Sequence, residues 1–309
     1  MRELRLLGFL VATSLFVGLV APRLGWASPD FLTGANLRDV LVNAAPFMIA
    51  ACGMTLVIVS GGIDISIGAL FAACAVAASA TARGEHPLPL AVLAPLGLGL
   101  AVGAWNGVLI AVARIPSIVA TLGMMTVIRG VTIYLTGSNE VRDLPAAFRH
   151  LSLGALFGIP FPLLLAFASV AITALFLSGT KPGREIYALG GNELAAQLSA
   201  IPVTRLRLLT HALCGAFVGL AALVHAARFS SVQPLMGGGF ELVVITAVVL
   251  GGTSILGGSG NVLGSALGAV TLEVIPNALT FLGVPTFWKE ATAGAVVLVA
   301  VLSSASARR

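Results

Sequence analysis

The sequence predicts an all-α, polytopic membrane protein with about ten transmembrane helices, and three observations lead to this prediction. Hydrophobic residues make up 58% of the 309 residues, whereas charged residues make up only 9%. So few charges cannot cover the surface of a soluble protein of this length. Apolar runs of roughly 20 residues, the length that crosses a bilayer, recur between polar or Gly- and Pro-containing breaks. We therefore expect a surface that faces lipid.

The predicted spans follow one another along the whole chain, so we expect one transmembrane domain over residues 1–309. The first run also resembles a secretory signal peptide, because Arg2 and Arg5 precede it and Ala27-Ser28 follow it. We expect it to stay as a first spanning helix, since everything after it is also apolar. The approximate spans are 6–22, 40–59, 66–82, 88–113, 116–136, 159–178, 206–227, 240–256, 262–283 and 288–305.

The stretch 179–207 is a long polar loop between two spans, and basic residues gather in it. The positive-inside rule places this loop, and both termini with it, in the cytoplasm. Within the loop, residues 192–199 predict a short helix, because Asn192 can cap a helix and Pro202 cannot continue one. Such a helix is either a docking surface or part of an ordinary connecting loop, and the residues alone leave both interpretations open.

Polar side chains inside the apolar spans are candidates for a translocation pathway, because unpaired polar groups in lipid are costly. Asp64 either accepts hydrogen bonds from the amides that open the next helix or contacts a solute. Glu273 lies near the middle of its span, and Pro276 follows within one turn. Glu273 is therefore either a pathway residue or a structural, paired or protonated group. The pathway candidates are Asp64, Ser66, Asn106, Thr121, Glu273 and Asn277.

Several kinds of site are not predicted. The glycine-rich stretch 251–261 lacks the Gly-Lys-Ser/Thr ending of a phosphate-binding loop, so we expect a tight re-entrant turn and no ATP site. A Gly pair also ends the apolar run at 57–62, which hints at an internal repeat. The three cysteines lie apart in apolar runs and predict neither a disulfide nor a metal site. No basic stripe with interleaved aromatics points to nucleic acid.

Five segments, 61–68, 115–124, 183–192, 247–260 and 283–288, together resemble one family. It comprises the permease subunits of ribose, xylose, rhamnose and autoinducer-2 type bacterial ATP-binding-cassette importers. The resemblance implies a pathway formed with a second permease copy or a paralogue in the cell inner membrane. It also implies a cytoplasmic ATPase, which uses the ATP, and a periplasmic sugar-binding protein. This chain itself would bind no cofactor and would translocate a monosaccharide or a related small polar solute.

By the same resemblance, the segment 190–202 is similar to the coupling helix that docks on the ATPase. Three positions depart from the family pattern: Ala200 stands where glycine is usual, Glu273 replaces a small residue and Pro276 replaces a polar one. The residues that we expect to take part in ATPase coupling are Gly190, Gly191, Asn192, Glu193, Ala195, Ala196, Ser199, Ile201 and Pro202.

Two other functions compete with the importer interpretation. An ion-coupled secondary transporter would need several buried carboxylates acting as a relay, and only Asp64 and Glu273 are candidates. A membrane-embedded enzyme would need a nucleophile, a metal cluster or paired acids in one place, and the sequence offers none of these. We therefore expect a transport subunit that is not an enzyme.

Overall fold

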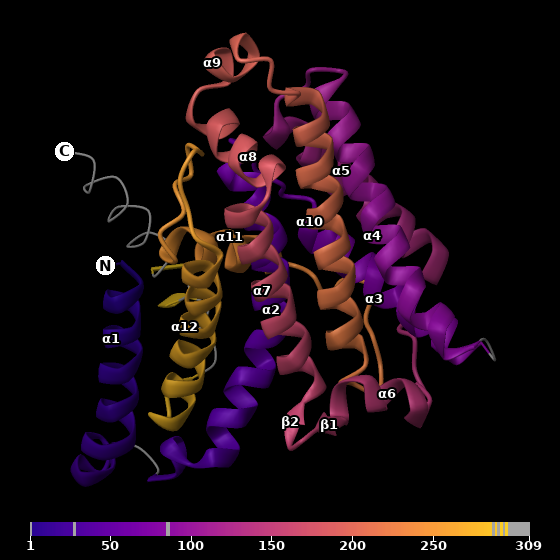
Figure 1. The fold of residues 1–309 in the computed structure, drawn as a ribbon. Coiled ribbons are helices and arrows are strands. Elements are labelled where there is room, and N and C mark those ends of the chain that lie inside the picture. Colours follow the sequence, from indigo (N-terminus) through magenta and orange to yellow (C-terminus); the bar gives the residue numbers. More distant parts are fainter. Residues whose placement is uncertain are drawn as a thin grey trace.

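The computed structural model describes residues 2–26, 29–84 and 87–285, together with positions 288, 291, 292, 294 and 295. The described chain is a bundle of helices with one short hairpin (Figure 1). The π-helix η1 (Phe16–Val20) and the 3-10 helices η2 (Pro22–Leu24) and η3 (Pro29–Leu32) follow the first helix. The α-helices are α1 (Arg2–Leu15), α2 (Gly34–Val59), α3 (Ile67–Arg83), α4 (Leu88–Ala111), α5 (Ser117–Thr136), α6 (Ala146–Leu153), α7 (Phe161–Gly179), α8 (Lys181–Gly191), α9 (Glu193–Leu198), α10 (Val203–Ala226), α11 (Phe240–Leu250) and α12 (Val262–Phe281).

The structure confirms a polytopic helical membrane protein, but it does not confirm ten spans. Among the described residues, seven helices are long and apolar enough to cross a membrane: Leu6–Leu24, Gly34–Val59, Leu88–Ala111, Ser117–Thr136, Phe161–Gly179, Val203–Ala226 and Val262–Phe281. Two further apolar helices, α3 and α11, are shorter. The span expected at 240–256 ends early because its chain turns at the Gly pair 251–252. The span expected at 288–305 falls almost entirely outside the described residues.

Helix α2 forms the centre of the bundle, and α10, α12, α7 and α11 pack against it. In its most apolar stretch 83% of the residues are buried, compared with 22% in α4 and in α5. Helices α4 and α10 approach closely at glycines: a Cβ atom at Gly103 of α4 would lie only 3.1 Å from Cα of Gly215 of α10. Small residues at such a crossing let two membrane helices pack backbone to backbone.

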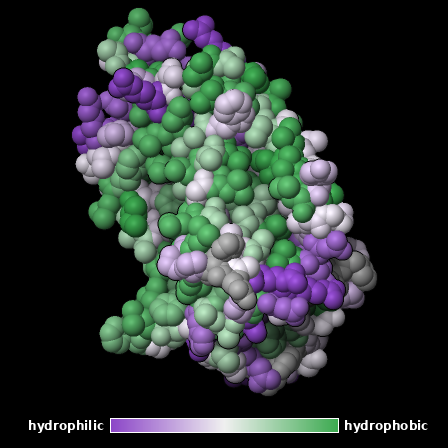
Figure 2. Space-filling model, turned by 90° about the vertical axis from the view of Figure 1, so that its right-hand side faces the viewer, coloured by the Kyte–Doolittle hydropathy of each residue, from purple (hydrophilic) through white to green (hydrophobic). Residues whose placement is uncertain are grey.

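The outer surface of α4 and α5 is apolar, as a lipid-facing or subunit-facing surface requires. Trp105, Val127 and Leu135 are more than half exposed there. Figure 2 shows a broad hydrophobic surface on this side of the molecule, with hydrophilic residues gathered towards its two ends.

The two ends of the bundle differ in structure (Figure 1). One end, which we call the α9 end, carries α8 and α9. The opposite end, which we call the α6 end, carries α6 and a hairpin in which β1 (Ala155–Leu156) pairs antiparallel with β2 (Ile159–Pro160). The sequence analysis predicted α9 but missed α8, α6 and the hairpin.

Candidate functional site

Helix α9 forms as its residues predict. Asn192 has extended backbone angles, and its Oδ1 accepts a hydrogen bond from the Ala195 N–H at 3.0 Å, which caps the helix. The helix ends at Leu198, and Ala200 then takes the left-handed conformation with φ of 57°. Glycine adopts this conformation without steric cost. The structure therefore gives a physical reason for the glycine that is usual in the resembled family.

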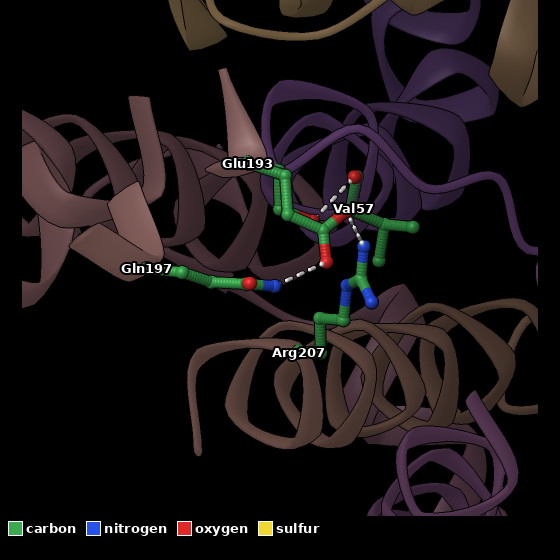
Figure 3. A network of polar contacts seen from close by, with 5 residues as sticks. Val57, Glu193, Gln197 and Arg207 are labelled. Carbon is green, nitrogen blue, oxygen red and sulfur yellow. Dashed lines mark hydrogen bonds and ion pairs between the residues drawn. The ribbon is translucent and has the colours of Figure 1, made fainter. Parts of the chain in front are cut away.

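Polar contacts fasten α9 to the start of α10. Glu193 accepts hydrogen bonds from Arg207 Nη2 at 2.6 Å and from Gln197 Nε2 at 3.2 Å. Figure 3 shows the Glu193 carboxylate between these two side chains, one from its own helix and one from α10. The pair is partly exposed, so its main effect is to fix the orientation of α9 rather than to stabilise the whole fold.

The outward face of α9 differs from the one that the sequence analysis emphasised. Ala196 is only 3% exposed, whereas Leu194 is 72% exposed and Leu198 is 91% exposed. Ile201 and Pro202 line a cavity of about 990 Å³ beneath α9. The exposed leucines were missed, although apolar residues four positions apart in a polar loop already indicate an apolar helix face.

Four of the six pathway candidates meet in one buried network between α2 and α3. Asp64 Oδ1 accepts hydrogen bonds from the Ser66 N–H at 2.9 Å and from Ser66 Oγ at 2.6 Å. Asn106 Nδ2 of α4 reaches Asp64 Oδ2 at 3.2 Å and Ser66 Oγ at 2.8 Å. The side chains of Asp64, Ser66 and Asn106 are at most 1% exposed. Asp64 thus closes the turn that leads into α3.

Helix α5 holds the same turn from the other side. Thr121 Oγ1 accepts a hydrogen bond from the Ile65 N–H at 3.1 Å, and Ser117 Oγ accepts one from the Ile63 N–H at 3.3 Å. These contacts satisfy backbone amides that a broken membrane helix would otherwise leave unpaired. Asp64, Ser66 and Asn106, bonded to one another, and Thr121, bonded to the backbone of Ile65, hold this segment in place.

Asn277 and Glu273 lie on α12 but in different surroundings. Asn277 and Asn36 exchange amide hydrogen bonds at 3.0 and 3.1 Å, which join α12 to the start of α2. Glu273 instead lines two neighbouring cavities of about 640 and 270 Å³ towards the α6 end, together with Phe47 and His225. Of the six candidates, only Glu273 lines these two cavities in the described part of the chain.

The smaller of these two cavities contains polar groups that the sequence analysis did not single out. Ser152 of α6 and Arg228, which follows α10, both line it beside Glu273. Among the described residues, Ser152 Oγ and Arg228 Nη1 have no hydrogen-bond partner. The cavity therefore offers unused donors next to a carboxylate acceptor. Only the fold could reveal this set, because Ser152 lies on α6, Arg228 follows α10 and Glu273 lies on α12.

Residues 36–301 match the protein family described as branched-chain amino acid transport system / permease component. This chain belongs to that family. The ribose import permease protein of Escherichia coli (strain K12) is 40% identical over 279 residues, covering 89% of this chain and 87% of the relative. That of Haemophilus influenzae is 35% identical over 301 residues, covering 96% and 93%. The autoinducer 2 import system permease protein of Escherichia coli O9:H4 is 37% identical over 278 residues, covering 90% and 81%.

Family membership confirms the resemblance read from the sequence segments. It makes this chain a multi-pass transport permease, and such permeases are not themselves enzymes. The names of the family and of the relatives mention branched-chain amino acids, ribose and autoinducer 2. Because one permease fold carries several solutes, the solute of this chain must be argued from its own residues.

Proposed function

We propose that this chain is the membrane-spanning subunit of an ATP-driven importer that moves a monosaccharide or a related small polar solute across a bacterial inner membrane. A second copy or a paralogue completes the pathway, a cytoplasmic ATPase of the ATP-binding-cassette type supplies the energy, and a periplasmic binding protein delivers the solute. The relatives' names support import, and the permease family supports an ATPase and a binding protein as partners.

The observation that carries the ATPase proposal is the apolar face of α9. Leu194 and Leu198 project from a short helix at one end of the bundle, where burial against a partner would remove apolar surface from water. The basic loop 181–207 at this end favours the cytoplasmic side. In this orientation both termini are cytoplasmic, and the α6 end faces the binding protein.

The cavity beside Glu273 supports a small polar solute. A carboxylate, a guanidinium, an amide and a hydroxyl lie around about 270 Å³, and the ring of Phe47 provides an apolar wall. A hydroxyl-rich solute can both donate to Glu273 and accept from Arg228 and Asn43. We therefore propose Glu273 as a solute contact and the other five pathway candidates as residues that hold the pathway helices in place.

The deciding experiment is co-expression with candidate ATPase and binding-protein subunits, followed by uptake of a panel of sugars into proteoliposomes with and without ATP. ATP-dependent uptake of a sugar is expected. Uptake that needs an ion gradient and does not depend on ATP would instead support the ion-coupled secondary transporter. Replacing Glu273 by Gln should change the relative uptake of different sugars, and unchanged preferences would leave Glu273 a structural residue.

The docking surface has a separate test with a matched control. Leu198→Glu should abolish co-purification of the ATPase, because a charge on the apolar face would have to be desolvated on docking. Leu156→Glu changes a half-exposed leucine at the α6 end and should leave co-purification intact. Equal recovery of the ATPase with both variants would remove α9 as its docking site.

A further inference from the structure

Three chain segments meet backbone to backbone directly below α9. They are the turn after α2, the end of α8 and the loop between α11 and α12, and they meet at five glycines that we call the glycine junction: Gly61, Gly190, Gly191, Gly257 and Gly258. The Gly258 N–H donates a hydrogen bond to the Val59 carbonyl at 2.9 Å, which joins the two turns directly.

Gly190 occupies the centre of the junction. A Cβ atom at this position would overlap the carbonyl oxygen of Val59 and would lie 2.6 Å from the amide nitrogen of Gly258. At the adjacent Gly191, a Cβ atom would meet no atom within 4 Å. Two neighbouring glycines at the end of one helix therefore differ sharply: one is required by close packing on both turns, and the other has open space for a side chain.

Helix α8 is also fixed to the bundle by its side chains. Ile186 and Leu189 are at most 2% exposed and pack in one cluster with Leu56 and Val59 at the end of α2. Tyr187 Oη donates a hydrogen bond to the Gly260 carbonyl at 2.9 Å. Partial burial raises the pKa of the Tyr187 phenol, so the phenol stays protonated and can donate at neutral pH.

The connection from the junction to α9 is short. Asn192 is both the residue that ends α8 and the residue that caps α9, so the two helices share a single joint. A displacement of α9 must therefore move the end of α8. Closely packed backbones cannot absorb such a displacement by gradual compression. The two turns that contact Gly190 must then shift with it.

We propose that Gly190 is a positioning residue for energy coupling, which passes a movement of α9 to the turns after α2 and after α11 at the same time. This inference rests on the proposed ATP-driven import. It goes further in assigning Gly190 an inward role, away from the docking face formed by Leu194 and Leu198. The turn after α2 and the loop after α11 then respond to one movement.

The experiment compares Gly190→Ala with Gly191→Ala in the complete transporter, reconstituted with its ATPase and binding protein. Three quantities are measured: recovery of the assembled complex, ATP hydrolysis stimulated by solute-loaded binding protein, and solute uptake. Gly190→Ala should assemble and hydrolyse ATP but transport at least about tenfold less solute per ATP, a loss equivalent to about 1.4 kcal/mol. Gly191→Ala should match the unmodified protein.

Equal transport per ATP in the two glycine variants would overturn the proposal. If Gly190→Ala fails to assemble, Tyr187→Phe decides, because it removes the hydrogen bond to Gly260 and adds no atoms. We expect Tyr187→Phe to assemble and to lose about threefold in transport per ATP, as the loss of one hydrogen bond predicts. An unchanged ratio in Tyr187→Phe would equally overturn the proposal. Failure of the unmodified protein to couple ATP to uptake would instead reject the proposed function.

Discussion

The turns at 57–62 and 248–253 share one backbone geometry but lead into different surroundings. In each, the N–H of the sixth residue donates to the carbonyl of the first, at 3.0 and 3.1 Å, and the N–H of the fifth donates to the second at 2.9 Å. The fifth residue is a glycine with positive φ in both turns, as a helix ending of the Schellman type requires. The weak echo seen in the sequence is therefore a real structural correspondence.

Beyond this shared geometry the two turns diverge. The first leads into a network in which Asp64, Ser66 and Asn106 bond to one another, while Thr121 accepts from the Ile65 N–H. The second is packed directly against a neighbouring backbone, because a Cβ atom at Gly251 would lie 2.4 Å or less from atoms of Gly264 and Ser265. We infer that the segment after the first turn is sensitive to the loss of side chains, whereas Gly251 in the second turn is sensitive to added atoms.

The largest effect is expected from Asp64→Ala, which removes the acceptor of three hydrogen bonds and leaves the Asn106 amide without its carboxylate partner. Hydrogen bonds to charged groups contribute about 1.5 to 3 kcal/mol each. The variant also removes the cost of burying the carboxylate, so we expect the free energy of unfolding to fall by about 3 kcal/mol in total. Heating the purified protein in detergent and measuring the surviving fraction by size-exclusion chromatography would show a midpoint lower by several degrees.

Asp64→Asn is the matched control for this loss, since it keeps the shape and one acceptor oxygen. It should lose less stability than Asp64→Ala. If both variants have the same thermal midpoint as the unmodified protein, the network does not hold the first turn. Asp64 would then be a candidate solute contact.

A transplant between the two turns should have the next largest effect. Ser60 of the first turn corresponds to Gly251 of the second, and Ser60 Oγ donates to the Val57 carbonyl at 2.7 Å. Gly251→Ser would force α11 and α12 apart, and such overpacking costs about 1 to 3 kcal/mol. Gly97→Ala, where a Cβ atom meets nothing within 4 Å, controls for the loss of a glycine. An unchanged thermal midpoint in Gly251→Ser would show that a serine fits at this position in both turns.

The sequence predicted the parts of these turns that depend on local residues and missed those that depend on partners. The Gly pairs and the capping residue Asn192 act within a few positions, so the breaks and α9 could be predicted. The close contact of Gly190 with Val59 joins residues far apart in the chain and has no local signal. For the same reason, Asp64 could not be told apart from a solute contact until Asn106 and Thr121 were placed beside it.

A smaller effect is expected from removing one of the hydrogen bonds that hold the segment after the first turn. Thr121→Val keeps the side-chain shape but leaves the Ile65 N–H without its acceptor, which should cost about 1 to 3 kcal/mol, towards the lower end because the amide is only partly buried. Thr126→Val on the same helix is the control, since its hydroxyl bonds only the exposed Leu122 carbonyl. The thermal midpoints of the two variants should differ by a few degrees. Equal midpoints would mean that the Thr121 hydrogen bond adds nothing to the stability of this segment.

The smallest effect is expected at Ala200, outside both turns, where removing a side chain should stabilise the protein. Ala200 carries a side chain at φ of 57°, where the left-handed conformation costs an L-residue roughly 1 to 2 kcal/mol. Ala200→Gly removes that strain. Because glycine has more conformational freedom, it also stabilises the unfolded chain by about 0.4 to 1 kcal/mol. We therefore expect a slight rise in the thermal midpoint, of about a degree, with unchanged recovery of the ATPase. A fall in the midpoint would show that the Ala200 methyl group contributes packing that outweighs its backbone strain.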